Sequence, residues 1–535
     1  MPAPELNFFL ESHVRVVEPL TRDINLAYWN ATISGKRSDF DRFADLLLDL
    51  QKIYSNSDEF DRVRKWKDDP RVTNPLERRQ IDLLYNDYLR NQIDPTLNEQ
   101  ITKLGSKIEN QFSVYRATLD GKKVTSNDIV KILVESDDAE LKRRAWQAGK
   151  DVAAVVSSDL IELVKLRNEA AESLGYDNFY SMSLDLNEQD ESAVIALFEE
   201  IDELTLEPFT TLKAEIDERI AARHHLRTAQ LRPWHYDDLY FQEAPRVLGT
   251  NLDRYYQDVD ILDVVHRFFS GIGLEIGDIL TGSDLYEKPG KDQHAYCTDI
   301  DRKGDIRILA NLKNNENWAA TMLHELGHAA YDKYIEPGLP YLLRHEAHIF
   351  TTEAVAMMFG RLSKDARWLR DAIGISERES EAISAELSKY SRLSQLIFAR
   401  WALVMMNFER ALYRDPHQDL NRLWWTLVKK YQGITPPENR DFPDWAAKSH
   451  VVSAPVYYHN YLLGEILASQ LTHSIRETAL PKKHRDGSFC GHPEVGAYLK
   501  EAVFASGARL HWDTMIRKAT GEPLTPRHFV KQFVE

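Results

Sequence analysis

Apolar residues recur three and four positions apart along most of this sequence. The spacing is clearest in residues 99–119, 192–226, 379–414 and 496–505, and it is typical of helices that bury one face. Glycine and proline, which interrupt helices, number only 23 and 21 among 535 residues. We therefore predict an all-α chain, and a hydrophobic content of 43% is enough for a large core.

One segment departs from the helical pattern. Residues 294–312, HAYCTDIDRKGDIRILANL, contain two extended runs on either side of the turn Asp301-Arg302-Lys303-Gly304. Glycine adopts the positive φ that such a turn requires. The segment predicts a small β-hairpin, to which an extended peptide can add as a further strand.

The stretch TMLHELGHAAY, residues 321–331, contains two candidate metal ligands and a candidate general base. Residues four apart share one face of a helix, so His324 and His328 can bind a single zinc ion. Glu325 lies one step round the helix, where it can take a proton from a water molecule at the open coordination position. Gly327 permits close approach by another element. The alternative is an ordinary amphipathic helix in which two histidines fall four apart by chance.

Zinc in a catalytic site needs a third protein ligand. Glu353 follows His328 by 25 positions, a suitable distance for a ligand on a second helix, which Thr351 or Thr352 would cap. Glu346 is the alternative ligand. Two further histidines nearby are interpreted as a polar helix face or pocket lining, namely His345 and His348.

A second polar segment follows at residues 448–466, KSHVVSAPVYYHNYLLGEI. Amide hydrolysis creates an oxyanion, which needs hydrogen-bond donors, and this segment supplies Lys448, His450, Tyr457, Tyr458 and Tyr461. Pro455 is suited to begin a helix on which Tyr458 and Tyr461 share a face. The alternative is that these tyrosines belong to a core or an interface.

Composition limits the partners and the compartment. The net charge is −17 and no block of lysine or arginine is present, so we expect no nucleic-acid partner. No apolar run approaches the ~20 residues of a membrane span, and the first residues do not resemble a signal peptide. Two distant cysteines, Cys297 and Cys490, favour a reducing compartment, and we expect a cytoplasmic location.

In four blocks, the sequence resembles the angiotensin-converting enzyme (peptidyl-dipeptidase A) family of gluzincins. The blocks are HAYCTDIDRKGDIRI, HELGHAAY, GLPYLLR with TEAVAM, and LWWTLVKKYQGITPP with KSH and the tyrosines. The resemblance covers residues 290–466, with a weaker similarity at 25–36. Residues 165–184 are more similar to the related thimet oligopeptidase and oligoendopeptidase families.

The resemblance implies an overall architecture and an activity. The fold would be a mainly helical ellipsoid with a deep central cleft and one small hairpin beside the zinc helix. Residues 1–535 would form a single catalytic unit, with 1–120 as an N-terminal helical lid and 290–466 as the zinc and substrate-binding core. The activity would be hydrolysis of short peptides with release of C-terminal dipeptides. Alternatives are an oligoendopeptidase, a carboxypeptidase, or an inactive peptide-binding protein; the oligomeric state is not predicted.

The resemblance also implies roles for individual residues. One Zn²⁺ per chain would be bound by His324, His328 and Glu353, with Glu325 as general base. His450 and a tyrosine, taken as Tyr461, would stabilise the oxyanion. Substrate backbone or the substrate's C-terminal carboxylate would be held by a further set, namely His294, Ala295, Lys448 and Tyr458.

Three positions depart from the family pattern. Met357 stands where the family has an aspartate one turn after the ligand glutamate, so the surroundings of the zinc ligands must be built differently. Trp234 stands where the family has a carboxylate-binding glutamine. Asn460 replaces an arginine through which several members are activated by chloride; in an alignment shifted by one residue, His459 stands there instead. The sequence therefore predicts activity that is independent of chloride.

Overall fold

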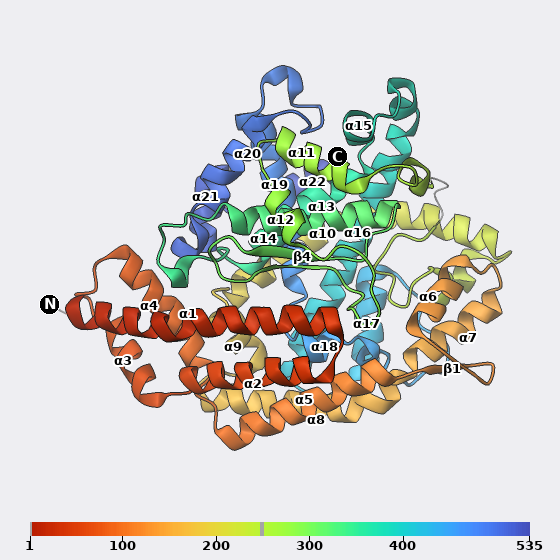
Figure 1. Cartoon of the computed structure of the whole chain (residues 1–535). Coiled ribbons are helices and arrows are strands. Elements are labelled where there is room, and N and C mark those ends of the chain that lie inside the picture. The colour runs from red at the N-terminus through yellow and green to blue at the C-terminus, as the bar shows by residue number, and fades with distance from the viewer. Residues whose placement is uncertain (1–2, 247–250, 535) are drawn as a thin grey trace. The chain divides into compact units, whose positions relative to one another are not determined.

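Helices make up most of the chain in the computed structural model, which describes residues 3–246 and 251–534 (Figure 1). The all-α prediction is confirmed, and the described strands form two small two-stranded sheets. The deep central cleft stays a prediction. Helices fall where the periodicity predicts them: α5 (Pro95–Val114), α10 (Glu191–Arg223), α16 (Glu377–Arg414) and α20 (Pro493–Leu499).

The chain divides into two compact units, each built from separate stretches of sequence. The first unit contains residues 3–92, 251–387 and 463–529, and the second contains 93–246, 388–462 and 530–534. Three helices contribute residues to both: α16, α19 (His459–Ser474) and α22 (Arg527–Phe533).

The remaining helices and strands of each unit are as follows. The first unit contains α1 (Ala3–Ser34), α2 (Arg37–Tyr54), α3 (Ser57–Lys67), α4 (Pro75–Leu89), α11 (Ile261–Gly271), α12 (Gly277–Gly282), β3 (Tyr296–Asp299), β4 (Ile306–Leu309), α13 (Glu316–Lys333), α14 (Ile349–Gly360), α15 (Ala366–Trp368) and α21 (Trp512–Thr520). The second contains β1 (Ala117–Leu119), β2 (Lys122–Val124), α6 (Ser126–Glu135), α7 (Ala139–Lys150), α8 (Val152–Ser173), α9 (Phe179–Leu186), α17 (Leu420–Gln432) and α18 (His450–Ser453).

The first four helices share one apolar core. Buried side chains of α1, α3 and α4 form it together with Tyr341 and Leu342, including Leu6, Phe9, Phe60, Val63, Ile81 and Leu84. Burial of such side chains contributes about 1.5–3 kcal/mol each. The N-terminal helices are therefore held to one another by a continuous hydrophobic cluster.

The predicted hairpin is present, and α1 packs against it. Strands β3 and β4 pair antiparallel, with Asp299 opposite Ile306, and the turn between them uses the positive φ of Arg302 and Gly304. Trp29 of α1 packs with the hairpin core. The hydroxyl groups of Thr32 and Tyr296 are 2.7 Å apart, so β3 is fixed to α1 by both apolar and polar side-chain contacts.

A second hairpin, between β1 and β2, was not predicted. The helical pattern of residues 99–119 suggested one continuous helix, but α5 ends at Val114 and Ala117–Leu119 form a strand instead. Asp120 and Gly121, with φ values of 50° and 78°, make the turn. Asp-Gly is a common sequence for a two-residue hairpin turn, and here this turn preference outweighs the helical spacing of the apolar residues.

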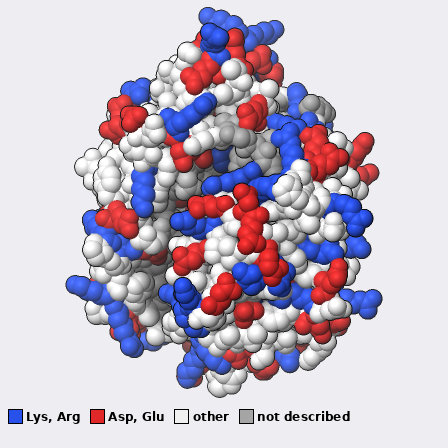
Figure 2. All heavy atoms as spheres, turned by 90° about the vertical axis from the view of Figure 1, so that its right-hand side faces the viewer, with Lys and Arg blue, Asp and Glu red and all other residues white. Residues whose placement is uncertain are grey.

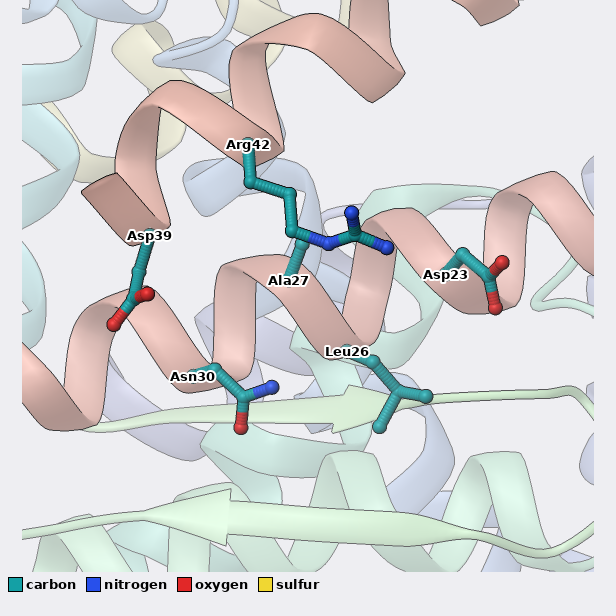
Figure 3. A pocket seen from close by; sticks show the side chains of 6 residues that line it. All are labelled: Asp23, Leu26, Ala27, Asn30, Asp39 and Arg42. Carbon is teal, nitrogen blue, oxygen red and sulfur yellow. The ribbon is translucent and has the colours of Figure 1, made fainter. Parts of the chain in front are cut away.

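The surface shows mixed charge and one notable hollow. On the face shown in Figure 2, basic and acidic side chains lie interspersed. A hollow of about 250 Å³ in the first unit is lined by residues of α1 and α2, among them Asp23, Asp39 and Arg42 (Figure 3). Among the described residues, no helix combines the length and apolar character that a membrane span requires.

Candidate metal centre and carboxylate-binding cluster

Two closely packed helices of the first unit carry the zinc motif. Asn315 caps α13 by accepting a hydrogen bond from the backbone N–H of Trp318 at 2.9 Å. Gly327 lies against α14, because a Cβ added at this position would stand only 2.6 Å from the Cα of Ala356. A side chain at position 327 would force the helices apart. Glycine therefore permits the close approach that the sequence suggests.

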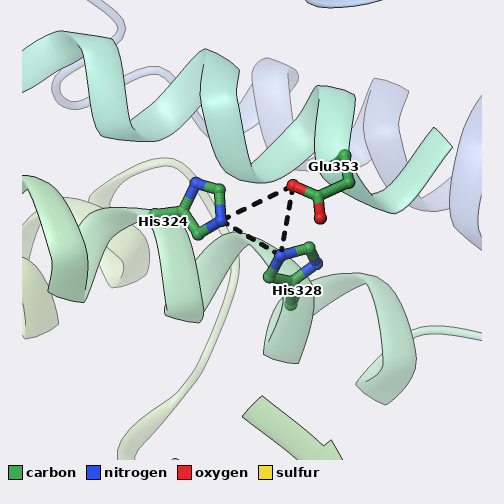
Figure 4. Close-up of side chains that lie close together, drawn as sticks. All are labelled: His324, His328 and Glu353. Carbon is green, nitrogen blue, oxygen red and sulfur yellow. Dashed lines mark hydrogen bonds and ion pairs between the residues drawn. The ribbon is translucent and has the colours of Figure 1, made fainter. Parts of the chain in front are cut away.

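The nitrogen and oxygen atoms of His324, His328 and Glu353 converge (Figure 4). The two Nε2 atoms are 3.2 Å apart. Oε2 of Glu353 lies 3.7 Å from Nε2 of His324 and 3.9 Å from Nε2 of His328. Glu346, the alternative ligand, belongs to no such group among the described residues; it lies instead near Asp332 and Tyr331.

This donor set fits a zinc ion. Tetrahedral bonds of about 2.0–2.1 Å place ligand atoms about 3.3 Å apart, close to the spacings observed. Burial lowers the pKa of His324 to about 4, and burial with the neighbouring His324 lowers the pKa of His328 well below its usual value. Both imidazoles are therefore neutral at pH 7 and present lone pairs to a cation. His324, His328 and Glu353 would hold the metal.

Glu325 lies in an environment that favours its protonated form. Burial, followed by repulsion from Glu353, raises the pKa of Glu325 to about 8. The backbone N–H of Cys297 on β3 donates a hydrogen bond to the Glu325 carboxylate and lowers that pKa in part. A bound cation would favour the ionised form. The hairpin therefore adjoins the residue suited to act as general base.

The start of α14 differs from the sequence interpretation. Neither Thr351 nor Thr352 caps the helix; His348 does, because its Nδ1 accepts a hydrogen bond from the backbone N–H of Phe350 at 3.2 Å. Thr351 completes the capping box, because its hydroxyl oxygen accepts a hydrogen bond from the backbone N–H of His348 at 3.3 Å; the same hydroxyl donates to the carbonyl of His348 at 2.6 Å. His348 stands at the start of the helix, with its ring packed on Phe350 and Trp512; the alternative that His345 and His348 line a pocket stays a prediction.

The residues predicted for substrate backbone lie at the entrance to β3. Ala295 directly precedes the strand, and His294 precedes Ala295 with a side chain that is 95% exposed. Nδ1 of His294 is 3.3 Å from Oδ1 of Asp292. Both residues therefore belong to the hairpin that adjoins Glu325.

The second unit assembles a cluster around the ammonium group of Lys448. Its Nζ donates a hydrogen bond to Oε1 of Gln242 at 2.8 Å, and the hydroxyl of Tyr458 lies 3.5 Å from the same oxygen. The rings of Tyr240, Trp401 and Tyr458 lie within 5.0–5.4 Å of Nζ. Burial lowers the pKa of Lys448 to about 8.

Gln242 was missed in the sequence analysis. Trp234, which stands at the family's glutamine position, packs instead on Trp146 in an apolar core. Gln242 comes eight residues later and supplies a glutamine amide to Lys448. An amide and an ammonium side by side form a suitable site for a carboxylate. The glutamine beside Lys448 is therefore Gln242, not the residue at position 234 where the family pattern has its glutamine.

Three contacts hold the loop that carries Gln242. The carboxylate of Asp238 accepts a hydrogen bond from the backbone N–H of Gln242 at 2.6 Å. The buried amide of Gln432 donates to the carbonyls of Tyr240 and Phe241 at 3.0 and 2.7 Å. These bonds stabilise a segment in which Phe241 has a φ of 52°.

His450 and the tyrosines lie beside this cluster. The His450 ring is 5.2 Å from that of Tyr458, and its Nδ1 is buried without a hydrogen-bond partner among the described residues. Burial, followed by repulsion from Lys448, lowers the pKa of His450 to about 4. Arg167 holds the end of α18 by donating to the carbonyls of Val451 and Val452. A neutral His450 can therefore donate a hydrogen bond.

The prediction that a helix begins at Pro455 was wrong. α19 begins at His459, because Val456 has a φ of 54° and its N–H donates to the buried carboxylate of Glu409 at 2.6 Å. Tyr458 precedes the helix and Tyr461 lies in its first turn. Their rings are nevertheless in contact, 5.3 Å apart. Tyr457 also packs on Tyr461, at 5.1 Å.

Comparison with known proteins places this architecture in a family. The sequence profile of peptidase family M3 matches residues 132–535, which include both the metal centre and the Lys448 cluster. The chain belongs to peptidase family M3. The profile of angiotensin-converting enzyme matches residues 4–230.

Curated relatives of this M3 family member include several angiotensin-converting enzymes. That of Rattus norvegicus is 22% identical over 425 residues, which are 74% of this chain and 32% of the relative. That of Haematobia irritans exigua is 25% identical over 301 residues, which are 52% of this chain and 48% of the relative. That of Theromyzon tessulatum is 22% identical over 425 residues, which are 74% of this chain and 68% of the relative.

These matches confirm the resemblance drawn from the sequence motifs. The chain spans about a third to a half of the length of the first two relatives. Two peptidase families and a donor set that fits zinc together support a zinc metallopeptidase.

Proposed function

We propose that this M3 family member hydrolyses peptide bonds in short peptides in a zinc-dependent reaction and releases C-terminal dipeptides. The convergence of His324, His328 and Glu353 carries the proposal, because two imidazoles and a carboxylate within reach of one ion form a three-ligand set for catalytic zinc beside Glu325. The proposed cytoplasmic location rests only on the cysteine content.

Each residue of the metal centre has a role in this proposal. A bound zinc ion would lower the pKa of a water molecule and polarise the scissile carbonyl. Glu325 takes a proton from the attacking water and later delivers it to the nitrogen of the departing amine. By the resemblance, His450 and Tyr461 would donate hydrogen bonds to the developing oxyanion.

Recognition of a free C-terminus is the finer part of the proposal. Lys448 is a buried cation whose hydrogen-bond acceptor, Gln242, is neutral. A substrate carboxylate would form the ion pair that Lys448 lacks among the described residues, and the amide of Gln242 can turn to donate a second hydrogen bond to it. His294 and Ala295 would hold the substrate backbone beside β3. This arrangement supports an exopeptidase over an oligoendopeptidase, which needs no carboxylate reader.

One experiment separates the modes of cleavage. Zinc-loaded protein is incubated with peptides of three to ten residues, each with either a free or an amidated C-terminus, and the products are identified by mass spectrometry. We expect C-terminal dipeptides from the free acids and slow cleavage of the amides. Single residues would indicate a carboxypeptidase, and internal cuts at equal rates in both series would indicate an oligoendopeptidase. Absence of any cleavage would indicate the inactive peptide-binding protein.

A further inference from the structure

The nitrogen of His328 that faces away from the metal centre has a partner of its own. Nδ1 of His328 lies 2.7 Å from the hydroxyl oxygen of Thr352. Nε2 of the same ring faces His324 and Glu353. The imidazole is therefore held at both nitrogens, on one side by the donor set and on the other by a side chain of α14.

Thr352 is a buried residue of α14, which holds its side chain in position. It is 6% exposed and directly precedes Glu353 on α14. The neighbouring hydroxyl of Thr351 is directed elsewhere, to the carbonyl of His348 at 2.6 Å and toward the hydroxyl of Tyr331 at 3.5 Å. Of these two adjacent threonines, only Thr352 contacts a residue of the donor set.

Metal binding through Nε2 requires one tautomer of His328. A lone pair on Nε2 is available to a metal only if the proton of the neutral ring is on Nδ1. Nδ1–H then donates to the Thr352 oxygen, which fixes the rotation of the ring. Partners of this kind are commonly carboxylates or carbonyls, and they orient ligands and raise their basicity. Met357, one turn after Glu353, has a thioether that cannot serve as a strong acceptor.

We propose that Thr352 is a positioning residue for the metal ligand His328, and that its hydroxyl provides the acceptor that Met357 cannot. The inference rests on the proposed function, since it assumes that the donor set holds zinc. A neutral hydroxyl polarises the imidazole less than a carboxylate does. The ligand is thus oriented by a hydrogen bond without a negative charge being added beside Glu325 and Glu353.

The test measures zinc affinity rather than activity. The dissociation constant is determined by competition with a chelator for wild type, Thr352→Val, Thr352→Ser and Thr351→Val. Thr352→Val keeps the shape of the side chain but removes the acceptor, and we expect about 10- to 100-fold weaker binding. Thr352→Ser keeps the hydroxyl and should stay within about threefold of wild type. Thr351→Val, the matched control, removes a neighbouring hydroxyl and should leave zinc affinity unchanged.

Thermal unfolding of the metal-free proteins separates positioning from folding. We expect Thr352→Val and wild type to unfold at similar temperatures without metal. A Thr352→Val protein with wild-type affinity would overturn the inference, as would a Thr352→Ser protein that loses as much affinity as valine. If Thr352→Val does not fold, Thr352→Ser and Thr352→Ala are compared in its place, with the same expectations for hydroxyl and no hydroxyl. Failure of wild type to bind zinc would overturn the proposed function instead.

Discussion

The metal centre and the Lys448 cluster are opposites in charge. In the first unit, two carboxylates lie close together, and burial with mutual repulsion raises the pKa of Glu325 to about 8. In the second unit, burial lowers the pKa of the Lys448 ammonium to about 8, and its hydrogen-bond acceptor is a neutral amide. One region is suited to a cation and the other to an anion.

This difference in charge shows how a buried ionised side chain can indicate a ligand site. Burying a charge costs free energy unless a partner of opposite sign is present. Lys142, elsewhere in the second unit, is buried beside the carboxylate of Asp237 at 2.5 Å and so has its partner within the fold. Lys448 forms no ion pair among the described residues, although the nearby carboxylates of Asp238 and Glu243 favour its charged form, so a ligand carboxylate would be a suitable partner for its ammonium group.

The largest effect is expected from Glu325→Gln. The substitution keeps the shape of the side chain and should keep the zinc, but it removes the group that moves protons in both steps. We expect kcat to fall about 10²- to 10⁴-fold, since positioned proton transfer contributes on that order. Metal content is measured alongside activity. Near wild-type activity in a zinc-replete variant would remove Glu325 from the mechanism.

Glu353→Gln sharpens the cation side of the comparison. An amide oxygen is a poorer zinc ligand than a carboxylate, so we expect most of the bound zinc to be lost on dialysis. Glu346→Gln is the matched control and should keep one zinc per chain. Metal content is determined by atomic spectroscopy. The opposite result, with zinc lost only from Glu346→Gln, would reassign the third ligand.

Lys448→Met tests the anion side. A charge-assisted hydrogen bond contributes about 1.5–3 kcal/mol, so KM for free-acid peptides should rise about 10- to 150-fold. Amidated peptides should change little. Lys150→Met is a matched control, because Lys150 is also buried and lies over the ring of Tyr240, 3.4 Å from its centroid, without contacting Gln242. Equal losses for acids and amides would favour the oligoendopeptidase.

The lowered pKa of Lys448 leads us to expect a pH dependence of free-acid cleavage. A lysine binds a carboxylate in its protonated form, which is present below the pKa and is lost above it. Because burial lowers the pKa of Lys448 to about 8, kcat/KM for a free-acid peptide should fall above pH 8 by about tenfold per unit, relative to the matching amide. Taking the ratio cancels other titrations. A ratio that stays constant from pH 7 to about 9.5 would show that Lys448 does not bind the carboxylate.

The smallest effect is expected from chloride. Asn460 is buried, and its Oδ1 accepts a hydrogen bond from Gln189, which also contacts His459 at 2.7 Å. This neutral network lacks the guanidinium to which the resemblance assigns chloride activation in several members of the angiotensin-converting enzyme family. Activity should be equal in sodium chloride and sodium acetate at matched ionic strength up to about 0.15 M. A saturable increase with chloride alone would place an anion site elsewhere.

The two regions also differ in how far the sequence predicts them. The metal centre follows from a four-residue spacing on one helix and a glutamate on the next helix, both of which are local patterns. The hydrogen bond between Lys448 and Gln242 joins residues 206 positions apart. It depends on a loop whose positive φ at Phe241 is stabilised by Gln432, a distant side chain. No local pattern in the sequence reports such a contact.

Errors in helix boundaries have the same origin. Thr351 and Thr352 are good capping residues by type, but the structure uses His348 for the cap and Thr352 for the His328 ring. Pro455 is well suited to start a helix, yet the buried carboxylate of Glu409 holds Val456 in a left-handed turn. Tertiary contacts overrode local preference at both positions.

The glycine at position 327 has a consequence for the choice of ion. Its missing side chain sets the separation between α13 and α14, and so fixes how far Glu353 stands from the two imidazoles. By bringing Glu353 of α14 close to the two imidazoles of α13, this packing completes a set of two nitrogen donors and one carboxylate, which suits zinc. Calcium needs about six to eight oxygen ligands, so the donor types of this site disfavour it.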